Sequence, residues 1–215
     1  MRIALIGASG YVGAKLREEA LQRGHRVVAI VRDPSRLPAH DALTARQADV
    51  YDSANVAAAV AGSDVVLSAF SSANEAEDVQ ARHVRAYRSI VAGTKHAGIN
   101  RLVVIGGAGS LFVAPGVQLV DTDEFPAEWK PGARGARDAL ADLQKETELD
   151  WAFVSPPPML VSGERTGKFK LGGDEVPTMR DGQPASISTD DLAVAVLDEI
   201  EKPKHHRQRF SVFAT

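Results

Sequence analysis

Residues 2–13 read RIALIGASGYVG, and this stretch decides the fold. Its first half, residues 2–7, is a nearly unbroken apolar run, which predicts a strand buried on both faces of a sheet. Residues 10–23 then show helical spacing, and Gly24 follows them, as is typical of the position just after a helix. Glycines stand at positions 7, 10 and 13, in the pattern G-x-x-G-x-x-G. The stretch therefore predicts a strand, a tight glycine-rich turn and a helix.

Each glycine of this turn has a distinct expected role in holding a dinucleotide. Gly7 permits the tight turn, Gly10 lets the backbone approach a pyrophosphate, and Gly13 lets the helix pack on the strand. Free N–H groups and the positive helix end then favour an anion. The predicted cofactor residues here are Gly7, Ala8, Ser9, Gly10, Tyr11, Val12 and Gly13. A tight turn with no ligand is the alternative, but the strand–turn–helix context favours a cofactor.

Apolar runs alternate with segments of helical spacing along most of the remaining chain. Further strands are expected at residues 26–31, 43–49, 64–70, 101–106 and 150–155, and a final strand, expected at a sheet edge, at 209–214. Helices are expected at residues 53–61, 76–97 and 134–147, with a last helix from Ser188. This alternation is typical of βαβ units, so the fold class is α/β, a Rossmann-type doubly wound parallel sheet.

Two long segments, residues 107–132 and 156–186, are rich in glycine and proline and lack a clear period. Loops of this length in a compact domain are usually functional. We expect both segments to cover a substrate, the second as a small irregular C-terminal lobe. The whole chain, residues 1–215, is predicted to be one domain.

Composition excludes several classes of protein. Of the 215 residues, 44% are apolar and 25% charged, and the net charge is −3. These values are ordinary for a soluble globular protein and lack the basic footprint of nucleic-acid binding. There is no cysteine, and the histidines are scattered, so no metal site is expected. No apolar stretch approaches the roughly 18 residues that span a membrane, and the first strand leaves no room for a signal peptide, so we expect a cytoplasmic protein.

The end of the second strand bears on the choice between NAD and NADP. Asp33 lies twenty residues after Gly13, and counting alone favours NAD, whose ribose hydroxyl an acidic residue binds. We place Arg32 at the strand end instead and assign Asp33 to capping a turn that starts at Pro34. Arg36 comes one helical turn later. NADP(H) is therefore the predicted cofactor and NAD(H) the less favoured one; two solvated surface arginines are the alternative.

Other strand ends supply further candidates, because ligands of doubly wound sheets lie across the carboxyl ends of the strands. Asp49 and Val50 end the third strand, and Ala69, Phe70 and Ser71 end the fourth, where an adenine ring would fit. Phe70 is equally well explained as a core aromatic residue. Ser110 follows a glycine-rich run and either faces the substrate or belongs to a flexible turn.

With these residues, the chain resembles the atypical short-chain dehydrogenase/reductases, in the NmrA-like group that includes biliverdin-IXβ/flavin reductase. The matching stretches are residues 7–13, 31–37, 62–64, 95–98, 101–109, 149–157 and 166–167. The resemblance implies that Pro156 and Pro157 border the nicotinamide. Gly106 and Gly107 are further candidate cofactor residues. The flavin/biliverdin reductase has Ser after the fifth strand and His after the sixth, where this chain has Gly107 and Pro158. Pro158 joins Ser110 as a candidate substrate contact.

Ordinary members of this superfamily use a Tyr-x-x-x-Lys pair to pass a proton to a carbonyl. Tyr87 has Val91 four residues on, and Tyr11 and Lys15 share the spacing but sit on the cofactor helix. A flavin can take a hydride without that acid. We therefore expect an NADPH-dependent reductase of a flavin or a similar flat conjugated acceptor, acting as a monomer or homodimer without nucleic acid or membrane. The alternative is a non-catalytic NADP(H)-sensing regulator of the NmrA type.

Overall fold

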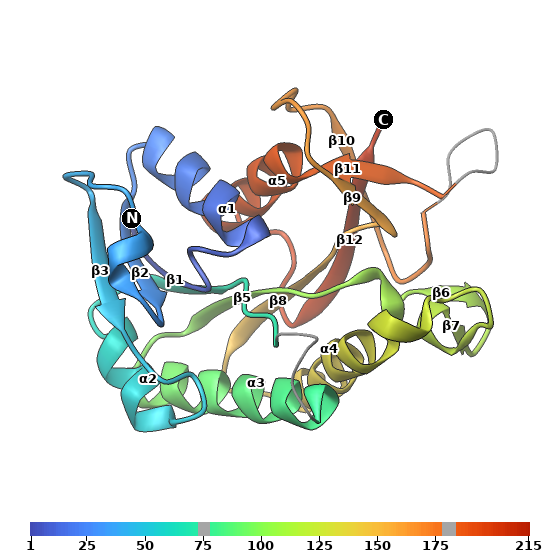
Figure 1. Ribbon diagram of the computed structural model, residues 1–215, viewed down its shortest axis with the longest axis horizontal. Helices are drawn as coiled ribbons and strands as arrows, with labels where there is room; N and C mark the ends of the chain where they lie inside the picture. The colour runs from blue at the N-terminus through green and yellow to red at the C-terminus, as the bar shows by residue number, and fades with distance from the viewer. Residues whose placement is uncertain (73–77, 178–183) are drawn as a thin grey trace.

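The computed structural model describes residues 1–72, 78–177 and 184–215. Within these ranges, one sheet contains β1 (Arg2–Ile6), β2 (Arg26–Val31), β3 (Leu43–Gln47), β4 (Val65–Ser68), β5 (Arg101–Ile105), β8 (Asp150–Ser155), β10 (Phe169–Gly172) and β12 (Gln208–Ala214). Their spatial order is β10, β12, β8, β5, β4, β1, β2, β3 (Figure 1). The neighbours pair in parallel except for β10, which pairs antiparallel with β12. The predicted doubly wound α/β fold is confirmed.

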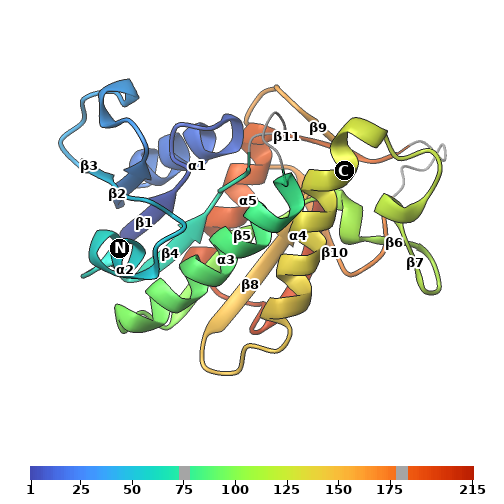
Figure 2. The same ribbon diagram turned by 60° about the horizontal axis from the view of Figure 1, so that its bottom comes forward.

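Helices cover both faces of this sheet. They are α1 (Tyr11–Gln22), α2 (Ser53–Val60), α3 (Val79–His96), α4 (Lys130–Leu143) and α5 (Thr189–Glu201). Helices α1 and α5 lie on one face, and α2, α3 and α4 on the other (Figure 1). Figure 2 shows α3 and α4 side by side along the sheet. In the part of the chain that the structure describes, no helix is long and apolar enough to cross a membrane.

The core has two halves, one on each face, because successive side chains of a strand point to opposite sides. In β1, Ile3 and Leu5 pack with residues of α1 and α5. Ala4 and Ile6 pack with residues of α2 and α3. All four side chains are buried, which explains why the sequence shows an apolar run here instead of an alternation.

The strand order reverses at β1. From there the chain passes through α1 to β2 and β3 on one side, and then returns to β4 and β5 on the other. Backbone hydrogen bonds join the end of β1 to both neighbouring strands at this point. The Gly7 N–H donates to the Ile30 carbonyl at 3.1 Å, and the Ala69 N–H donates to the Ile6 carbonyl at 2.9 Å. In open α/β sheets, ligands bind outside the carboxyl ends of the strands at such a reversal. The fold therefore positions the Gly-rich turn at the expected ligand crevice.

One expectation about the last strand is wrong. Strand β12 is not at an edge of the sheet, because β10 pairs beyond it and β12 lies between β8 and β10. Strand β10 comes from residues 156–186, which the sequence indicated to be irregular. Its side chains are only partly buried, with the pattern intermediate, exposed, exposed, intermediate. Because its side chains are partly exposed, β10 has no apolar run from which the sequence could predict a strand.

The two segments expected to be irregular contain other short elements. Strands β6 (Phe112–Ala114) and β7 (Val117–Gln118) form a hairpin, and 3₁₀ turns occur at Ala108–Ser110, Leu119–Asp121 and Ala127–Trp129. In the second segment, β9 (Met159–Val161) pairs in parallel with β11 (Ser186–Ser188). Residues 178–183 of that segment lie outside the described residues.

Helix boundaries differ from the expectation by a few residues. The expected start of the third helix, Ala76, lies outside the described residues, and α3 is described from Val79. Helix α4 begins at Lys130, four residues before the expected start, with a proline in its first turn. Proline is well tolerated there because the first N–H groups of a helix have no partner within it. Helix α4 ends at Leu143, before the expected 147.

Candidate cofactor site

The Gly-rich turn requires glycine at its first and last positions. Gly7 has a φ of +82°, and a Cβ atom there would lie 2.7 Å from the Ala69 carbonyl oxygen. A Cβ atom on Gly13 would overlap the Gly7 carbonyl oxygen. Gly13 is buried, so α1 packs directly on the turn at this point. The geometry suits the roles that the sequence assigned to Gly7 and Gly13.

Gly10 is placed where an anion could approach. It is the N-cap of α1, with φ −77° and ψ 174°, and its N–H donates to the Gly7 carbonyl at 3.0 Å. Among the described residues, no side chain caps this helix start, and its first turn has no acidic residue. Ser9, Gly10 and Tyr11 are exposed, whereas Ala8 is buried. The first N–H groups of α1 therefore remain open to a negatively charged group.

The residues after β2 form a short 3₁₀ turn, Pro34–Arg36. Asp33 caps it as predicted, accepting from the Ser35 N–H at 3.0 Å and from the Ser35 hydroxyl at 2.7 Å. The Ser35 hydroxyl bond, with the backbone bond beside it, lowers the pKa of Asp33. Arg32 and Arg36 are exposed on the same turn. The carboxylate is thus engaged locally, while both guanidinium groups face solvent.

An aromatic cluster stands where β3 and β4 end. The Phe70 ring meets Tyr51 edge-on, with centroids 6.2 Å apart, and Tyr87 at 6.1 Å. Phe70 and Val50 are half-buried and pack against the core on the α2–α3 face. Asp49 and Ser71 are exposed, and Ala69 lies against Gly7. Phe70 therefore packs as a core aromatic with one part still accessible.

Tyr51 was not singled out from the sequence, although it directly follows Val50. The guanidinium carbons of Arg82 and Arg85, on α3, lie 5.2 and 5.3 Å from the centroid of its ring. The position of Tyr51 next to a strand end was a usable signal. The two arginines come from a distant helix and had no signal in the local sequence.

Tyr87 is buried, with only 2% of its surface exposed. Its hydroxyl, which has one hydrogen to donate, lies 3.1 Å from the Phe70 carbonyl oxygen and 3.4 Å from the Ile105 carbonyl oxygen. Burial raises the pKa of Tyr87 to about 12. The ring stacks on His83, whose pKa burial lowers to about 4, and the Ser72 hydroxyl lies 3.2 Å from His83 Nδ1. These groups hold the start of α3 against the sheet.

The ends of β5 and β8 bring a second set of predicted residues together. Gly106 follows β5, its N–H donates to the Val154 carbonyl at 2.9 Å, and a Cβ atom there would overlap the Phe153 ring. Pro156 and Pro157 follow β8 and are buried, and Pro158 is half-buried. Gly107 is half-buried beside Gly106. These residues therefore lie together at the carboxyl ends of the neighbouring strands β5 and β8.

Ser110, a candidate substrate contact, is buried. Its hydroxyl and its carbonyl oxygen both face Arg209 Nη1, at 3.2 and 2.9 Å. Arg209 stands on β12 and was not identified from the sequence. The two residues are 99 positions apart, and no local pattern links them.

Residues 162–168 are hydrogen-bonded to α1 and to α5. Arg165 donates to both carboxylate oxygens of Glu19 at 2.7 and 2.8 Å, and Tyr11 Oη lies 3.0 Å from Ser162 Oγ. The N–H groups of Thr166 and Gly167 each donate to Asp191 Oδ1 at 2.7 Å. This part of the second segment is therefore anchored to the body of the protein.

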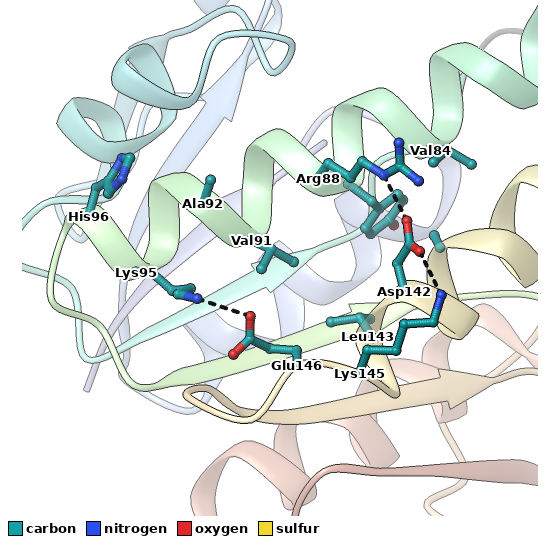
Figure 3. A pocket seen from close by; sticks show the side chains of 12 residues that line it. Val84, Arg88, Val91, Ala92, Lys95, His96, Asp142, Leu143, Lys145 and Glu146 are labelled. Carbon is teal, nitrogen blue, oxygen red and sulfur yellow. Dashed lines mark hydrogen bonds and ion pairs between the residues drawn. The ribbon is translucent and has the colours of Figure 1, made fainter.

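A cavity of about 350 Å³ lies elsewhere, in the groove between α3 and α4 (Figure 3). Its floor is apolar, with Val91 and Leu143, and ion pairs cross its rim, such as Arg88–Asp142 at 2.7 Å. None of the predicted cofactor residues lines it. The predicted cofactor residues lie instead at and near the carboxyl ends of the strands.

Comparisons with known proteins agree with this geometry. A family model described as NAD(P)H-binding matches residues 7–203. The chain is 40% identical over 215 residues to the uncharacterized protein YwnB of Bacillus subtilis (strain 168), covering 99% of this chain and 98% of YwnB.

Two solved structures are similar to this chain over nearly its whole length. A protein from Bacteroides thetaiotaomicron, named as a candidate epimerase, has a TM-score of 0.92 at 40% identity, covering 99% of this chain and 96% of that one. A protein from Streptococcus pneumoniae TIGR4, named as a candidate NADH-flavin reductase, has a TM-score of 0.87 at 34% identity, with both chains fully covered. The chain belongs to the NAD(P)H-binding family, in the atypical short-chain dehydrogenase/reductase group that includes the NmrA-like proteins.

Proposed function

We propose that this protein binds NADPH at the turn from Gly7 to Gly13 and reduces a flavin or a similarly flat conjugated acceptor. The observation that carries the proposal is the uncapped start of α1 at the point where the strand order reverses. Backbone N–H groups and the helix dipole favour a pyrophosphate there. The whole chain acts as one unit in this proposal, with residues 107–132 and 156–186 covering the acceptor.

Selectivity for NADPH over NADH rests on the turn after β2. Arg32 and Arg36 are exposed beside the expected position of the adenosine ribose, and Asp33 is engaged by Ser35. A guanidinium group can bind a 2′-phosphate through two parallel hydrogen bonds. An engaged carboxylate is less available for a ribose hydroxyl. The balance of charges therefore supports NADPH.

The acceptor end is proposed at Gly106, Gly107, Pro156 and Pro157, where the chain offers backbone and proline rings instead of charged side chains. Exposed apolar side chains on the two segments suit a flat conjugated molecule: Val113, Val117, Trp129, Met159, Val161 and Leu171. Pro158 is a proposed substrate contact. Ser110, predicted from the sequence as a second contact, is buried, so we propose that it acts through the conformation of its turn.

The proposal takes neither Tyr87 nor the Tyr11–Lys15 pair as a proton donor, which favours acceptors that need no acid. The Tyr87 hydroxyl lies within hydrogen-bond distance of two carbonyl groups, and position 91 is a valine. Lys15, four residues after Tyr11, pairs with Asp190 at 3.1 Å, and this hydrogen bond raises the pKa of Lys15. Reduction of a simple ketone relies on an acid worth typically about 10²–10⁴-fold. When bound, the nicotinamide supplies a hydride, and a flavin can accept it while water supplies the proton.

A non-catalytic NADP(H) sensor is the second candidate, and the position of Tyr87 inside the core is compatible with it as well. Steady-state oxidation of NADPH with FMN, riboflavin and quinones separates the two. Turnover with one of these acceptors supports the reductase. Tight NADP(H) binding without turnover of any of them supports the sensor.

A further inference from the structure

Arg209 holds a position unlike that of the surface arginines. It lies on β12, between β8 and β10, and only 6% of its surface is exposed. Its guanidinium group donates through Nε to Asp174 Oδ1 at 2.5 Å and through Nη1 to the Ser110 carbonyl at 2.9 Å. Its carbon Cζ lies 5.9 Å from the centroid of the Phe112 ring. The side chain thus contacts Asp174, which lies between β10 and β11, and also Ser110 and Phe112, which follow β5.

These contacts connect the two segments that we propose to cover the acceptor. Ser110 and Phe112 belong to residues 107–132, and Asp174 belongs to residues 156–186. The backbones meet at the same place: the Phe112 N–H donates to the Asp174 carbonyl at 2.8 Å, and the Val176 N–H donates to the Phe112 carbonyl at 2.9 Å. The two segments are therefore joined to each other as well as to the sheet.

The position of this junction relates it to the acceptor. Ser110 is three residues after Gly107, which follows the end of β5. The 3₁₀ turn Ala108–Ser110 therefore sets the path of the chain as it leaves Gly107, and Arg209 fixes the last residue of that turn by both its carbonyl and its hydroxyl. Because its Nε and Nη1 donate to Asp174 and Ser110 and only 6% of its surface is exposed, we assign Arg209 to positioning the chain and not to direct contact with the acceptor.

We propose that Arg209 is a positioning residue that sets the shape of the acceptor site by locking residues 107–112 to residues 174–176. This inference rests on the proposed function, because it takes the acceptor to lie between these segments. A rigid junction keeps the acceptor aligned with the nicotinamide. Loosening the junction would disturb the surface that binds the acceptor as well as its alignment, and a misplacement of about 1 Å can cost on the order of 100-fold.

The test compares Arg209→Met with a matched control, Arg101→Met. Arg101 is also a buried strand arginine, 9% exposed, and donates from Nη2 to Glu199 Oε1 at 2.7 Å. Arg101 is the first residue of β5, so it lies at the amino end of the strand, away from the carboxyl ends where the acceptor is proposed to bind. Both changes lower the melting temperature. Arg209→Met raises the KM for the acceptor on the order of tenfold or more and leaves the Kd for NADPH within about twofold, while Arg101→Met changes neither.

Two further measurements keep the result interpretable. Arg209→Lys keeps the charge but not the planar fork, so its acceptor KM falls between those of the parent and Arg209→Met. Amide hydrogen exchange at Phe112 and Val176 becomes faster in Arg209→Met and in Asp174→Asn, and not in Arg101→Met. Asp174 has 65% of its side chain exposed, so its replacement is compatible with folding.

The outcomes separate this inference from the proposed function. If the parent turns over an acceptor but Arg209→Met and Arg101→Met raise its KM equally, Arg209 is only a stabilising residue and the inference is overturned. Unchanged amide exchange in a folded Arg209→Met variant also overturns it. If the parent turns over no acceptor, the proposed function fails, and the positioning role in an acceptor site fails with it, whatever the exchange data show about the junction.

Discussion

Gly10→Val is expected to abolish most NADPH binding without unfolding the protein. The Gly10 backbone is extended, at φ −77° and ψ 174°, a conformation that valine adopts readily. A Cβ atom there would meet the Gly7 carbonyl oxygen at 3.3 Å, which a shift of a few tenths of an ångström relieves. The residue is exposed, so the added methyl groups project toward the proposed site of the pyrophosphate and not into the core.

The size of the loss follows from the hydrogen bonds that such a side chain prevents. A hydrogen bond to a charged group contributes about 1.5–3 kcal/mol. Each lost bond between a backbone N–H group and a pyrophosphate oxygen therefore weakens binding about 10- to 100-fold. We expect Gly10→Val to lose at least one such bond, with NADH and NADPH affected alike because both carry the pyrophosphate.

The assay is a titration of NADPH followed by protein or cofactor fluorescence, with thermal melts of each variant. Gly24→Ala is the matched control. Gly24 has a φ of +79° and nothing within 4 Å of an added Cβ atom, so its replacement strains the backbone far from the turn. This control should lower the melting temperature and keep its NADPH affinity. A folded Gly10→Val variant that binds NADPH as tightly as the parent would refute the reasoning.

Three further changes give distinct expectations. Arg32→Ala should weaken NADPH by about 10- to 100-fold and leave NADH almost unchanged, because only NADPH carries the 2′-phosphate; equal losses in parallel titrations would instead favour Asp33 as the ribose ligand. Tyr87→Phe should keep NADPH-flavin turnover within a few-fold of the parent, since the hydroxyl is bonded to carbonyl groups inside the core; a loss of about 10²-fold in steady-state kinetics would show that it acts as an acid. The hydrogen bonds from Arg165 lower the pKa of Glu19, so its carboxylate stabilises the fold above its unfolded pKa, near 4.3, and that contribution is lost as the pH falls through its folded value. The stability difference between the parent and Glu19→Gln in urea melts should therefore be largest near pH 7 and shrink below about pH 4; a difference independent of pH would contradict this.

Local patterns account for the parts of the fold that the sequence predicted well. The strand, turn and helix of residues 2–23 follow from an apolar run, three spaced glycines and a helical period, all within a short stretch. The cap by Asp33 also depends only on its neighbours, since it accepts from a residue two positions on. Interactions of this kind need no knowledge of the rest of the chain.

The remaining features depend on residues far apart. The bond between Arg209 and Ser110 spans 99 positions, and that between Arg165 and Glu19 spans 146. The place of β12 in the sheet depends on β10, a strand whose exposed side chains leave no apolar pattern. Ser110 could not be assigned from the sequence either, because its hydrogen-bond partner is an arginine on β12.

The most direct test of the account is anaerobic single-turnover mixing of the NADPH-bound protein with FMN, following the loss of NADPH absorbance. The parent should oxidise NADPH and reduce FMN in equal amounts, faster than the uncatalysed reaction, and Gly10→Val should not exceed the uncatalysed rate. A parent protein that binds NADPH tightly but leaves it unoxidised with FMN, riboflavin and quinones would contradict the account and identify a sensor.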